Sequence, residues 1–289
     1  RATGARQRRT EMRRIGFALN PYNERAGAML ERGQAWCAAN GVEAWDAAGD
    51  AEERIGGELD STDMVCVLGG DGTFLRTARA IGGSGVPALG VNLGRVGFLA
   101  KVESDGLEGA LDQVLAGDYS VEERFRIAAR LVRVDGPTEE HACLNEVGVA
   151  RGSRVRMIQL EVEVSGSHLA TYVADAVVVA TPTGSTAYSF SAGGSILDPR
   201  LRNMVITPVA AYLSPLHSVV AGEEQEVDLV LRDSHGGALV SLDGQLDLPL
   251  LVGDRVEVRA LAEPLRMIEP RGSTPFYDLL RTKASLLPY

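Results

Sequence analysis

One apolar strand that runs into a glycine-rich turn constrains this chain more than any other feature. Residues 64–68 read Met-Val-Cys-Val-Leu, a continuous apolar run of strand length, as expected for a strand buried on both faces of a sheet. Gly69-Gly70-Asp71-Gly72 follows at once, and a helix is predicted to start at Thr73. A buried strand, a tight turn and a helix in this order indicate a parallel sheet with helices on its faces.

The sequence on either side of this turn alternates strands and helices. An apolar run at 15–19 ends in a turn at Asn20-Pro21, and helical spacing predicts a helix over 22–40 that ends at Gly41. Another buried strand is predicted over 86–91, and a short amphipathic helix over 106–116. This alternation predicts a mainly parallel α/β domain in the N-terminal part.

From about residue 120 the apolar residues recur with a period of two. Ile158, Leu160 and Val162 alternate with polar residues, as in a half-buried antiparallel strand over 155–164. Similar strands are predicted at 170–180, 226–232, 238–242 and 254–260. A helical pattern returns after Pro275. The predicted fold class is therefore α/β plus all-β, with an N-terminal parallel domain, a C-terminal antiparallel β-rich domain and a last helix that returns to the first domain.

Composition and charge exclude several classes of protein. With 45% hydrophobic and 24% charged residues the chain is globular, and no apolar run approaches the roughly 20 residues of a membrane-spanning helix. A net charge of −10 argues against general nucleic-acid binding. Cys37, Cys66 and Cys143 are too far apart for a zinc site or a disulfide framework, which favours a reducing cytoplasm.

The first 14 residues form a basic leader with six arginines and one glutamate. We expect it to be a flexible segment before the first strand. It lacks the apolar region of a secretory signal, and a mitochondrial-type targeting role stays open.

A carboxylate within the glycine turn is the most informative chemical feature. Glycines let the backbone approach a phosphate, but the charge of Asp71 would repel one. Asp71 makes sense as the acceptor of a proton from an attacking hydroxyl, or as a magnesium ligand. The alternative is a tight turn closed by an Asx-type hydrogen bond, and the turn alone does not decide between them. The sequence has neither a P-loop nor a GxGxxG dinucleotide turn.

Two further polar clusters follow apolar strands. Asn145-Glu146 interrupts an apolar stretch, so at least one of the two side chains should be buried or lie at the edge of a cleft, although the pair taken alone slightly favours a strand-end turn. Residues 176–180 predict a strand that breaks at Pro182 into a turn rich in hydroxyls and glycine, with Ser185 as N-cap of a short helix from Thr186. Two such strand-to-helix turns in one chain favour a nucleotide-binding enzyme.

These motifs together closely resemble the NAD kinase family. The segments that carry the resemblance are GGDGTFLRTAR (69–79), LGVNLGRVGFLA (89–100), LNEV (144–147), DAVVVATPTGSTAYSFSAGG (175–194), SLDGQ (241–245) and FYDLLRTK (276–283). They stand in the family's order over about residues 15–285. Diacylglycerol, sphingosine and phosphofructokinases also have a GGDG loop, but they lack the TPTGSTAY segment.

The resemblance implies a role for each matching residue. Asp71 matches the proton acceptor and Gly72 the phosphate contact beside it, in a phosphate loop that also includes Gly69, Gly70 and Thr73. Substrate contacts are implied at Arg76, Asn145, Glu146, Arg156, Asp175, Thr186, Ala187, Tyr188, Ser189, Phe190, Ser191, Ala210 and Gln245. Asp175 matches a carboxylate at the nicotinamide end, near Val173. No protein metal site is implied, because Mg²⁺ or another divalent cation would arrive on the phosphates of ATP.

This chain also departs from the family pattern. Val173, Ala176 and Ser195 stand where family members usually have Arg or Gly, Gly and Pro. Residues 210–217 lack the basic residue that the family carries there. None of these differences removes the implied base.

The expected function is transfer of the γ-phosphate of ATP to the 2′-hydroxyl of the adenosine ribose of NAD, in an active cleft between the two domains. We expect a leader (1–14), an α/β domain with the GGDG loop (15–119), a β-rich dinucleotide-binding domain (120–270) and a helix that packs back (271–289). The partners are NAD and ATP, in a cytoplasmic homodimer or homotetramer without nucleic acid or membrane. Two alternatives remain: a catalytically weak NAD(P)(H)-binding regulator, and a GGDG-type kinase of another hydroxyl acceptor. The choice between ATP and polyphosphate as donor also stays open.

Overall fold

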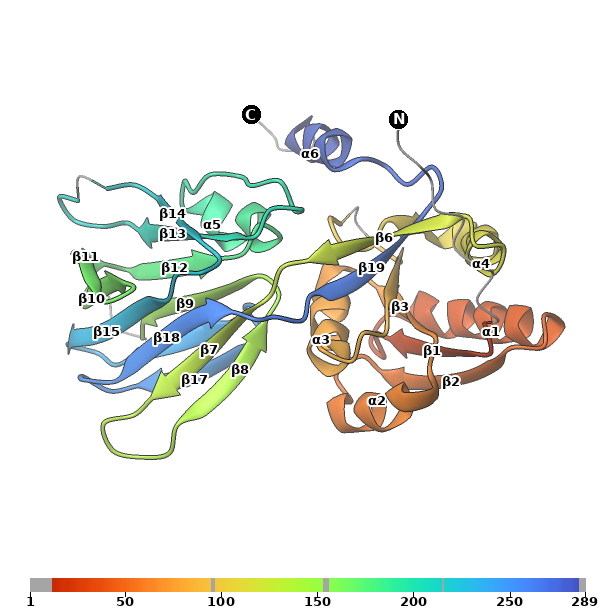
Figure 1. The fold of residues 1–289 in the computed structure, drawn as a ribbon, viewed down its shortest axis with the longest axis horizontal. Coiled ribbons are helices and arrows are strands. Elements are labelled where there is room, and N and C mark those ends of the chain that lie inside the picture. The colour runs from red at the N-terminus through yellow and green to blue at the C-terminus, as the bar shows by residue number, and fades with distance from the viewer. Residues whose placement is uncertain (1–11, 95–96, 153–155, 215, 286–289) are drawn as a thin grey trace. The chain divides into compact units, whose positions relative to one another are not determined.

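A parallel sheet organises the N-terminal part of the chain (Figure 1). The structure is a computed structural model that describes residues 12–94, 97–152, 156–214 and 216–285. The sheet has the strand order β2-β1-β3-β4-β19-β6, and β5 pairs with β4. Its strands are β1 (Arg14–Leu19), β2 (Glu43–Ala48), β3 (Met64–Gly69), β4 (Ala88–Asn92), β5 (Val102–Glu103), β6 (Tyr119–Arg124) and β19 (Leu265–Pro270). All six residues of β3 are buried between β1 and β4, as their apolar run predicts.

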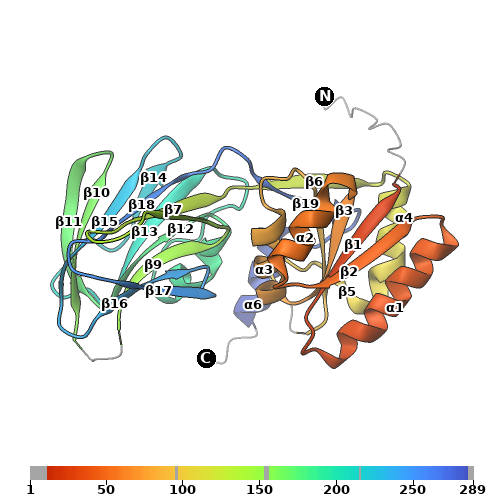
Figure 2. The ribbon, with the colours of Figure 1, turned by 90° about the horizontal axis from the view of Figure 1, so that it is seen from below.

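Helices cover both faces of this sheet (Figures 1 and 2). On one face lie α1 (Glu24–Ala39) and α4 (Leu107–Leu115), which share a hydrophobic core with β1, β3 and β4. On the other lie α2 (Glu52–Glu58) and α3 (Asp71–Ile81). Short 3₁₀ helices occupy Leu59–Ser61 and Ser104–Gly106. The predicted stop of α1 is confirmed, because Gly41 has a φ of +69°, a conformation that favours glycine.

Two antiparallel sheets of six strands form the second half of the fold. The first has the order β11-β10-β15-β18-β7-β8 and the second β14-β13-β12-β9-β16-β17. Their strands are β7 (Ile127–Val132), β8 (Glu139–Cys143), β9 (Glu146–Arg151), β10 (Ile158–Val164), β11 (Ser167–Ala174), β12 (Ala176–Ala180), β13 (Asn203–Val209), β14 (Val219–Gly222), β15 (Val227–Ser234), β16 (Ala238–Leu242), β17 (Leu246–Leu250) and β18 (Arg255–Ala260). A 3₁₀ turn (Gly184–Thr186) and α5 (Tyr188–Ser191) follow β12.

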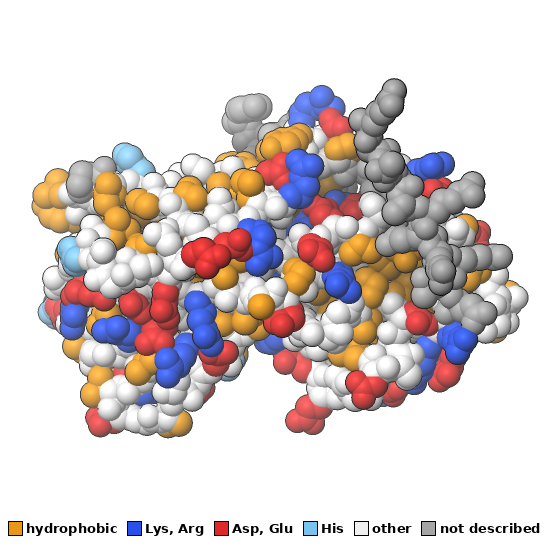
Figure 3. Space-filling model, in the orientation of Figure 1, with side chains coloured by type: hydrophobic (Ala, Val, Ile, Leu, Met, Phe, Trp, Pro, Cys, Tyr) orange, Lys and Arg blue, Asp and Glu red, His pale blue; other side chains and the backbone are white. Residues whose placement is uncertain are grey.

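The alternating residues of these strands pack the two sheets face to face. Val162 of β10 and Val177 and Val179 of β12 belong to one buried core. The outward face of the first sheet carries ion pairs, such as Arg232–Glu161 (2.6 Å) and Arg130–Glu257 (2.8 Å), and Figure 3 shows basic and acidic side chains interspersed over β15, β18 and β7. This separation of apolar and charged faces is what a period of two produces.

The chain divides into two compact units, described separately below. Unit 1 consists of the chain up to Glu123 together with the chain from Leu265 onward, and unit 2 is Arg124–Pro264. The last helix, α6 (Phe276–Ser285), belongs to unit 1, where the Phe276 ring lies 6.0 Å from that of Phe98 and Lys283 Nζ lies 4.1 Å above the Phe98 ring. The predicted fold class is confirmed.

The structure corrects one sequence prediction, and another falls on residues that it does not describe. The single strand predicted over 170–180 is wrong, because β11 ends at Ala174 and β12 begins in the other sheet at Ala176, with Asp175 between them. The narrower strand predicted over 176–180 is confirmed as β12. Most of the basic leader, residues 1–11, lies outside the described residues. Among the described helices, none is both long enough and apolar enough to cross a membrane.

Candidate functional site

In unit 1, the glycine turn carries Asp71 from the carboxyl end of β3 onto the first turn of α3. Gly70 is the N-cap of α3, and its carbonyl accepts hydrogen bonds from the N–H groups of Thr73 and Phe74 (both 3.0 Å). A Cβ on Gly69 would lie 2.5 Å from Thr73 Oγ1, so only glycine allows this turn to close. The turn therefore needs its first glycine for close packing.

The Asp71 carboxylate is held by a distant segment of unit 1, rather than by its own turn. Oδ2 accepts the N–H of Phe98 (2.8 Å), and Oδ1 accepts those of Leu99 (3.0 Å) and Ala100 (3.4 Å). A Cβ on Gly97 would lie 2.0 Å from Asp71 Oδ1, so the absence of a side chain there permits the contact. These bonds orient the carboxylate and leave one lone pair, on Oδ2, for a further donor, such as a hydroxyl that gives up its proton.

In unit 2, the pair Asn145-Glu146 stands at the start of β9, and its backbone is held by Asp243. Asp243 Oδ1 accepts the N–H groups of Asn145 (2.7 Å) and Glu146 (3.0 Å), and Oδ2 accepts that of Leu144 (3.0 Å). The Asn145 carbonyl in turn accepts the N–H of Thr181 (2.8 Å). The predicted pair is thus a fixed part of unit 2 rather than a loose strand end.

Both members of this pair have a buried oxygen without a hydrogen-bond partner among the described residues. These atoms are Asn145 Oδ1 and Glu146 Oε2. Burial raises the pKa of Glu146 to about 8, and the negative charge of Asp243 adds to the shift. Because buried polar atoms normally have partners, the two oxygens point to a ligand that supplies them.

The raised pKa of Glu146 makes stability depend on pH. Its ordinary value is 4.5, so between about pH 4.5 and 8 the unfolded chain loses this proton while the folded protein keeps it, and the free energy of unfolding falls as pH rises. Glu146→Gln cannot ionise, so we expect it to exceed the wild type in stability by about 2–4 kcal/mol at pH 8 but by little at pH 4.5. Urea unfolding at both pH values measures this; an equal difference at both would contradict it.

Asp175 lies at the crossover between the two sheets of unit 2 and forms an ion pair. Arg151 Nε lies 2.8 Å from Asp175 Oδ1, and the Arg151 N–H donates to the Asp175 carbonyl (2.9 Å). The Asp175 N–H donates to the Val209 carbonyl (3.0 Å). The backbone of Asp175 is therefore fixed by β9 and β13, and the charge of its carboxylate is partly balanced by Arg151.

The turn after β12 has the predicted place but a different internal structure. Ser185 is not a helix N-cap: it lies inside the 3₁₀ turn, donates to the Pro182 carbonyl (2.6 Å) and accepts the N–H of Leu197 (2.9 Å). The N-cap of α5 is Ala187, and no side-chain hydrogen bond caps this helix. A Cβ on Gly184 would lie 2.1 Å from the Asn145 carbonyl oxygen, so this turn packs directly on the backbone of the Asn145-Glu146 pair.

The other predicted site residues divide between the two units. Gly72, Thr73 and Arg76 lie with Asp71 on α3. In unit 2, the exposed or partly exposed residues are Arg156, Thr186, Ala187, Tyr188, Phe190, Ser191, Ala210 and Gln245. Ser189 is buried, and its hydroxyl lies 3.0 Å from that of Thr207 on β13.

Sequence reasoning assigned no role to Gly97, Arg151 or Asp243. Gly97 lies in the 89–100 segment and Asp243 in SLDGQ, both of which contribute to the family resemblance. The Asp243-Gly244 dipeptide is also a turn signal. Neither pattern shows which backbone groups a carboxylate binds, and the Arg151–Asp175 pair has no sequence signal.

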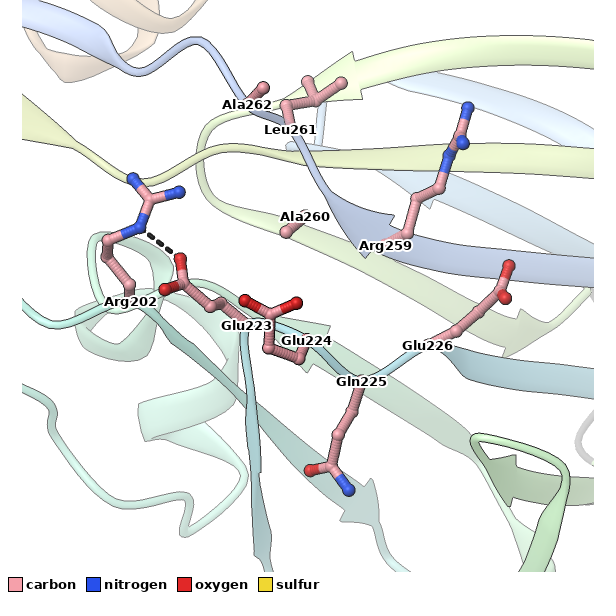
Figure 4. A pocket seen from close by; sticks show the side chains of 9 residues that line it. All are labelled: Arg202, Glu223, Glu224, Gln225, Glu226, Arg259, Ala260, Leu261 and Ala262. Carbon is pink, nitrogen blue, oxygen red and sulfur yellow. Dashed lines mark hydrogen bonds and ion pairs between the residues drawn. The ribbon is translucent and has the colours of Figure 1, made fainter.

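A surface hollow of unit 2 lies apart from all of these residues. It has a volume of about 410 Å³ and is lined by Arg202 and by residues 223–226 and 259–262 (Figure 4). Arg202 pairs with Glu223, and Glu224 and Glu226 add negative charge. Arg259 adds a second positive charge, so the three carboxylates exceed the two guanidinium groups by one and the hollow does not favour phosphate groups. Within the described ranges, no three His, Cys, Asp or Glu side chains are grouped to hold a metal ion.

Comparison with known proteins gives one family for both halves of the chain. Residues 15–119 match the ATP-NAD kinase N-terminal domain, and residues 144–269 match the ATP-NAD kinase C-terminal domain. The NAD kinase of Heliobacterium modesticaldum is 43% identical over 225 residues, 78% of this chain and 79% of that protein. The NAD kinase of Citrifermentans bemidjiense is 35% identical over 288 residues, 94% of this chain and 98% of that protein.

Two solved structures have the same fold at lower sequence identity. Yeast NADH kinase complexed with NADH has a TM-score of 0.83 at 22% identity, over 96% of this chain and 88% of that one. An NAD kinase from Archaeoglobus fulgidus in complex with ATP has a TM-score of 0.78 at 23% identity, over 95% of this chain and all of that one.

Proposed function

Because the chain belongs to the NAD kinase family, we propose that it transfers the γ-phosphate of ATP to the 2′-hydroxyl of the adenosine ribose of NAD, with Asp71 as the base. The observation that carries the role of Asp71 is its carboxylate, which three backbone amides orient at the first turn of α3. A base that is held in place needs no reorganisation when the hydroxyl arrives.

In this proposal Asp71 accepts the hydroxyl proton while the ribose oxygen forms its bond to the γ-phosphorus and ADP leaves. Phosphoryl transfer depends mostly on alignment and on neutralised charge. Mg²⁺ or another divalent cation, brought by the ATP phosphates, would neutralise the charge of the donor. Gly69, Gly70, Gly72 and Thr73 form the turn that we assign to the phosphates, and Arg76 adds a cation on the same helix.

We assign the dinucleotide to unit 2. The buried oxygens of Asn145 and Glu146, which have no hydrogen-bond partner among the described residues, suit the hydroxyl and amino donors of a nucleotide. Asp175 lies at the place assigned to the nicotinamide end, and residues 186–191 with Arg156, Ala210 and Gln245 complete the proposed contacts.

The direct test is formation of NADP from NAD and Mg-ATP by the purified protein, with polyphosphate as a second donor. Release of NADP with either donor supports the proposal. A folded protein that binds NAD calorimetrically without turnover would instead be a regulator, and phosphate transfer to a different radiolabelled acceptor would indicate another kinase.

We expect weak discrimination between NAD and NADH. The oxidised nicotinamide carries a positive charge that Asp175 would favour, but Arg151 already balances this carboxylate at 2.8 Å. Val173 adds neither a charge nor a side-chain donor. The ratio of kcat/KM for NAD to that for NADH should therefore stay within about tenfold, or roughly 1.4 kcal/mol.

Arg151→Gln removes the balancing charge and should raise this ratio. Steady-state kinetics with both dinucleotides measures it in the two proteins. A wild-type preference of a thousandfold, or a ratio that Arg151→Gln lowers, would contradict the assignment of Asp175.

We also propose a cytoplasmic homodimer or homotetramer. Cys37, Cys66 and Cys143 are all buried and form no disulfide among the described residues, as a reducing compartment maintains. Tyr212 and Leu213 are 65% and 83% exposed, and the Tyr212 N–H donates to the Val173 carbonyl (2.8 Å). Exposed apolar side chains on one edge of unit 2 suit contact with a second copy. Light scattering on the wild type and on Leu213→Asp tests this: a wild-type monomer would contradict it.

A further inference from the structure

Asp243 has no assigned part in the reaction, yet its carboxylate is one of the most heavily bonded groups in unit 2. It is 6% exposed and accepts three successive backbone N–H groups, those of Leu144, Asn145 and Glu146, at 2.7–3.0 Å. Its own N–H donates to the Glu146 carbonyl (2.9 Å). Asp243 thus binds one short segment, residues 144–146, through both its side chain and its backbone.

The turn in which Asp243 lies does not by itself require a carboxylate. Asp243 and Gly244 join β16 to β17 with φ values of +53° and +63°. Asn-Gly serves such a turn as well as Asp-Gly, because Asn tolerates positive φ equally. What Asn cannot do is accept three N–H groups with two equivalent oxygens, since one of its two terminal groups is a donor. The three backbone N–H groups that must be accepted therefore explain why this position carries Asp rather than Asn.

We propose that Asp243 is a positioning residue, which fixes the backbone of residues 144–146 so that the Asn145 and Glu146 side chains are presented together to the dinucleotide. The proposal rests on the dinucleotide role given above to this pair. Successive side chains of a regular strand point to opposite faces of the sheet. The Asn145 and Glu146 side chains can therefore both reach one ligand only if the backbone that joins them is held in a single conformation. Asp243 fixes this backbone immediately before β9, where the hydrogen bonds between the strands of the sheet have not yet begun.

The charge of Asp243 also acts on the pair. The buried Glu146 carboxyl faces Asp243, whose negative charge adds to the effect of burial in raising the pKa of Glu146 to about 8. Asp243 also acts on the buried Arg126: burial lowers the pKa of Arg126, and the charges of Asp243, Cys143 and Glu263 partly offset this lowering. Removing the charge of Asp243 therefore lowers the pKa of Glu146, and exposure of Glu146 to solvent acts in the same direction, because burial is the larger cause of its raised pKa.

Asp243→Asn tests the proposal, with Asp247→Asn as its matched control. Asp247 is exposed on β17 of the same hairpin and opposes Ser241 in the ladder, so its substitution makes the same chemical change without touching residues 144–146. NAD affinity is measured by calorimetry between pH 6 and 9. The wild type should bind more tightly as pH rises through about 8, since the ionised Glu146 accepts hydrogen bonds from NAD.

We expect Asp243→Asn to weaken NAD binding about 10–100-fold and to move the midpoint of the pH profile to lower pH, and Asp247→Asn to do neither. Wild-type affinity in Asp243→Asn would overturn the proposal. A loss of affinity with an unmoved midpoint would also overturn it, because it would show that Asp243 does not act on Glu146.

Two further variants keep the outcomes distinct. If Asn145→Ala and Glu146→Gln leave NAD binding unchanged, the dinucleotide role of the pair is wrong, whatever Asp243 does. If they weaken binding and Asp243→Asn does not, the positioning role alone is wrong. Should Asp243→Asn fail to fold, Asp243→Gly accepts the positive φ without strain and is held to the same two criteria.

Discussion

Asp71→Asn should lower the rate of phosphoryl transfer by about 10²–10⁴-fold, the usual range for a lost general base. The amide is a far weaker base than the carboxylate. It also fits the site poorly, because both Asp71 oxygens accept backbone N–H groups, Oδ2 from Phe98 and Oδ1 from Leu99 and Ala100. Either orientation of an Asn amide sets its NH₂ group against one of these donors. Single-turnover rates are the measurement to make, since they report chemistry rather than product release.

Asp63→Asn separates loss of the base from loss of amide hydrogen bonds. Asp63 directly precedes β3, at the opposite end of the strand, and its Oδ2 accepts the N–H groups of Arg13 (2.6 Å) and Arg14 (2.8 Å). Its substitution makes the same chemical change at a carboxylate that also holds a distant backbone segment. We expect it to stay within a few-fold of the wild-type rate. An Asp71→Asn rate as high as that of Asp63→Asn would show that Asp71 is not the base.

The elements around the glycine turn were predictable because their signals are local. A strand buried on both faces reads as an unbroken apolar run, and β3 lies where that run is. The Asn145-Glu146 pair was predictable as a polar interruption, since a buried polar group needs a reason to be there. In both cases the residues that carry the information are neighbours in the chain.

The contacts that hold the functional carboxylates were not predictable from the sequence, because each joins distant segments. Asp71 binds residues 98–100, Asp243 binds residues 144–146, and Asp175 binds Arg151. Such hydrogen bonds depend on which loops packing brings together, and no periodicity records that. The break at Asp175 was missed for a related reason. Apolar residues continue on both sides of it without a Gly or Pro, so the passage from one sheet to the other leaves no turn signal.

Gly97→Ala should reduce the single-turnover rate about 10²-fold without removing any functional group. The added Cβ would lie 2.0 Å from Asp71 Oδ1 and 2.6 Å from its Cγ, far inside van der Waals contact. The carboxylate or the 97–100 segment must move, and a displacement of about 1 Å at a reacting group costs a factor of this size. The new methyl group meets the Asp71 carboxylate itself, so the steric contact is the expected cause of the loss.

Gly94→Ala is the control for this substitution. It adds the same methyl group to the same connection after β4, at a site where nothing lies within 4 Å of the new Cβ and where φ is not positive. Its rate should match the wild type.

The double variant Asp71→Asn with Gly97→Ala tests whether Gly97 acts through Asp71. If Gly97 acts only by letting the Asp71 carboxylate reach its amides, the second substitution adds little once the carboxylate is gone, and the two effects are strongly non-additive. Two losses that multiply in full would mean that Gly97 serves the reaction through some group other than Asp71.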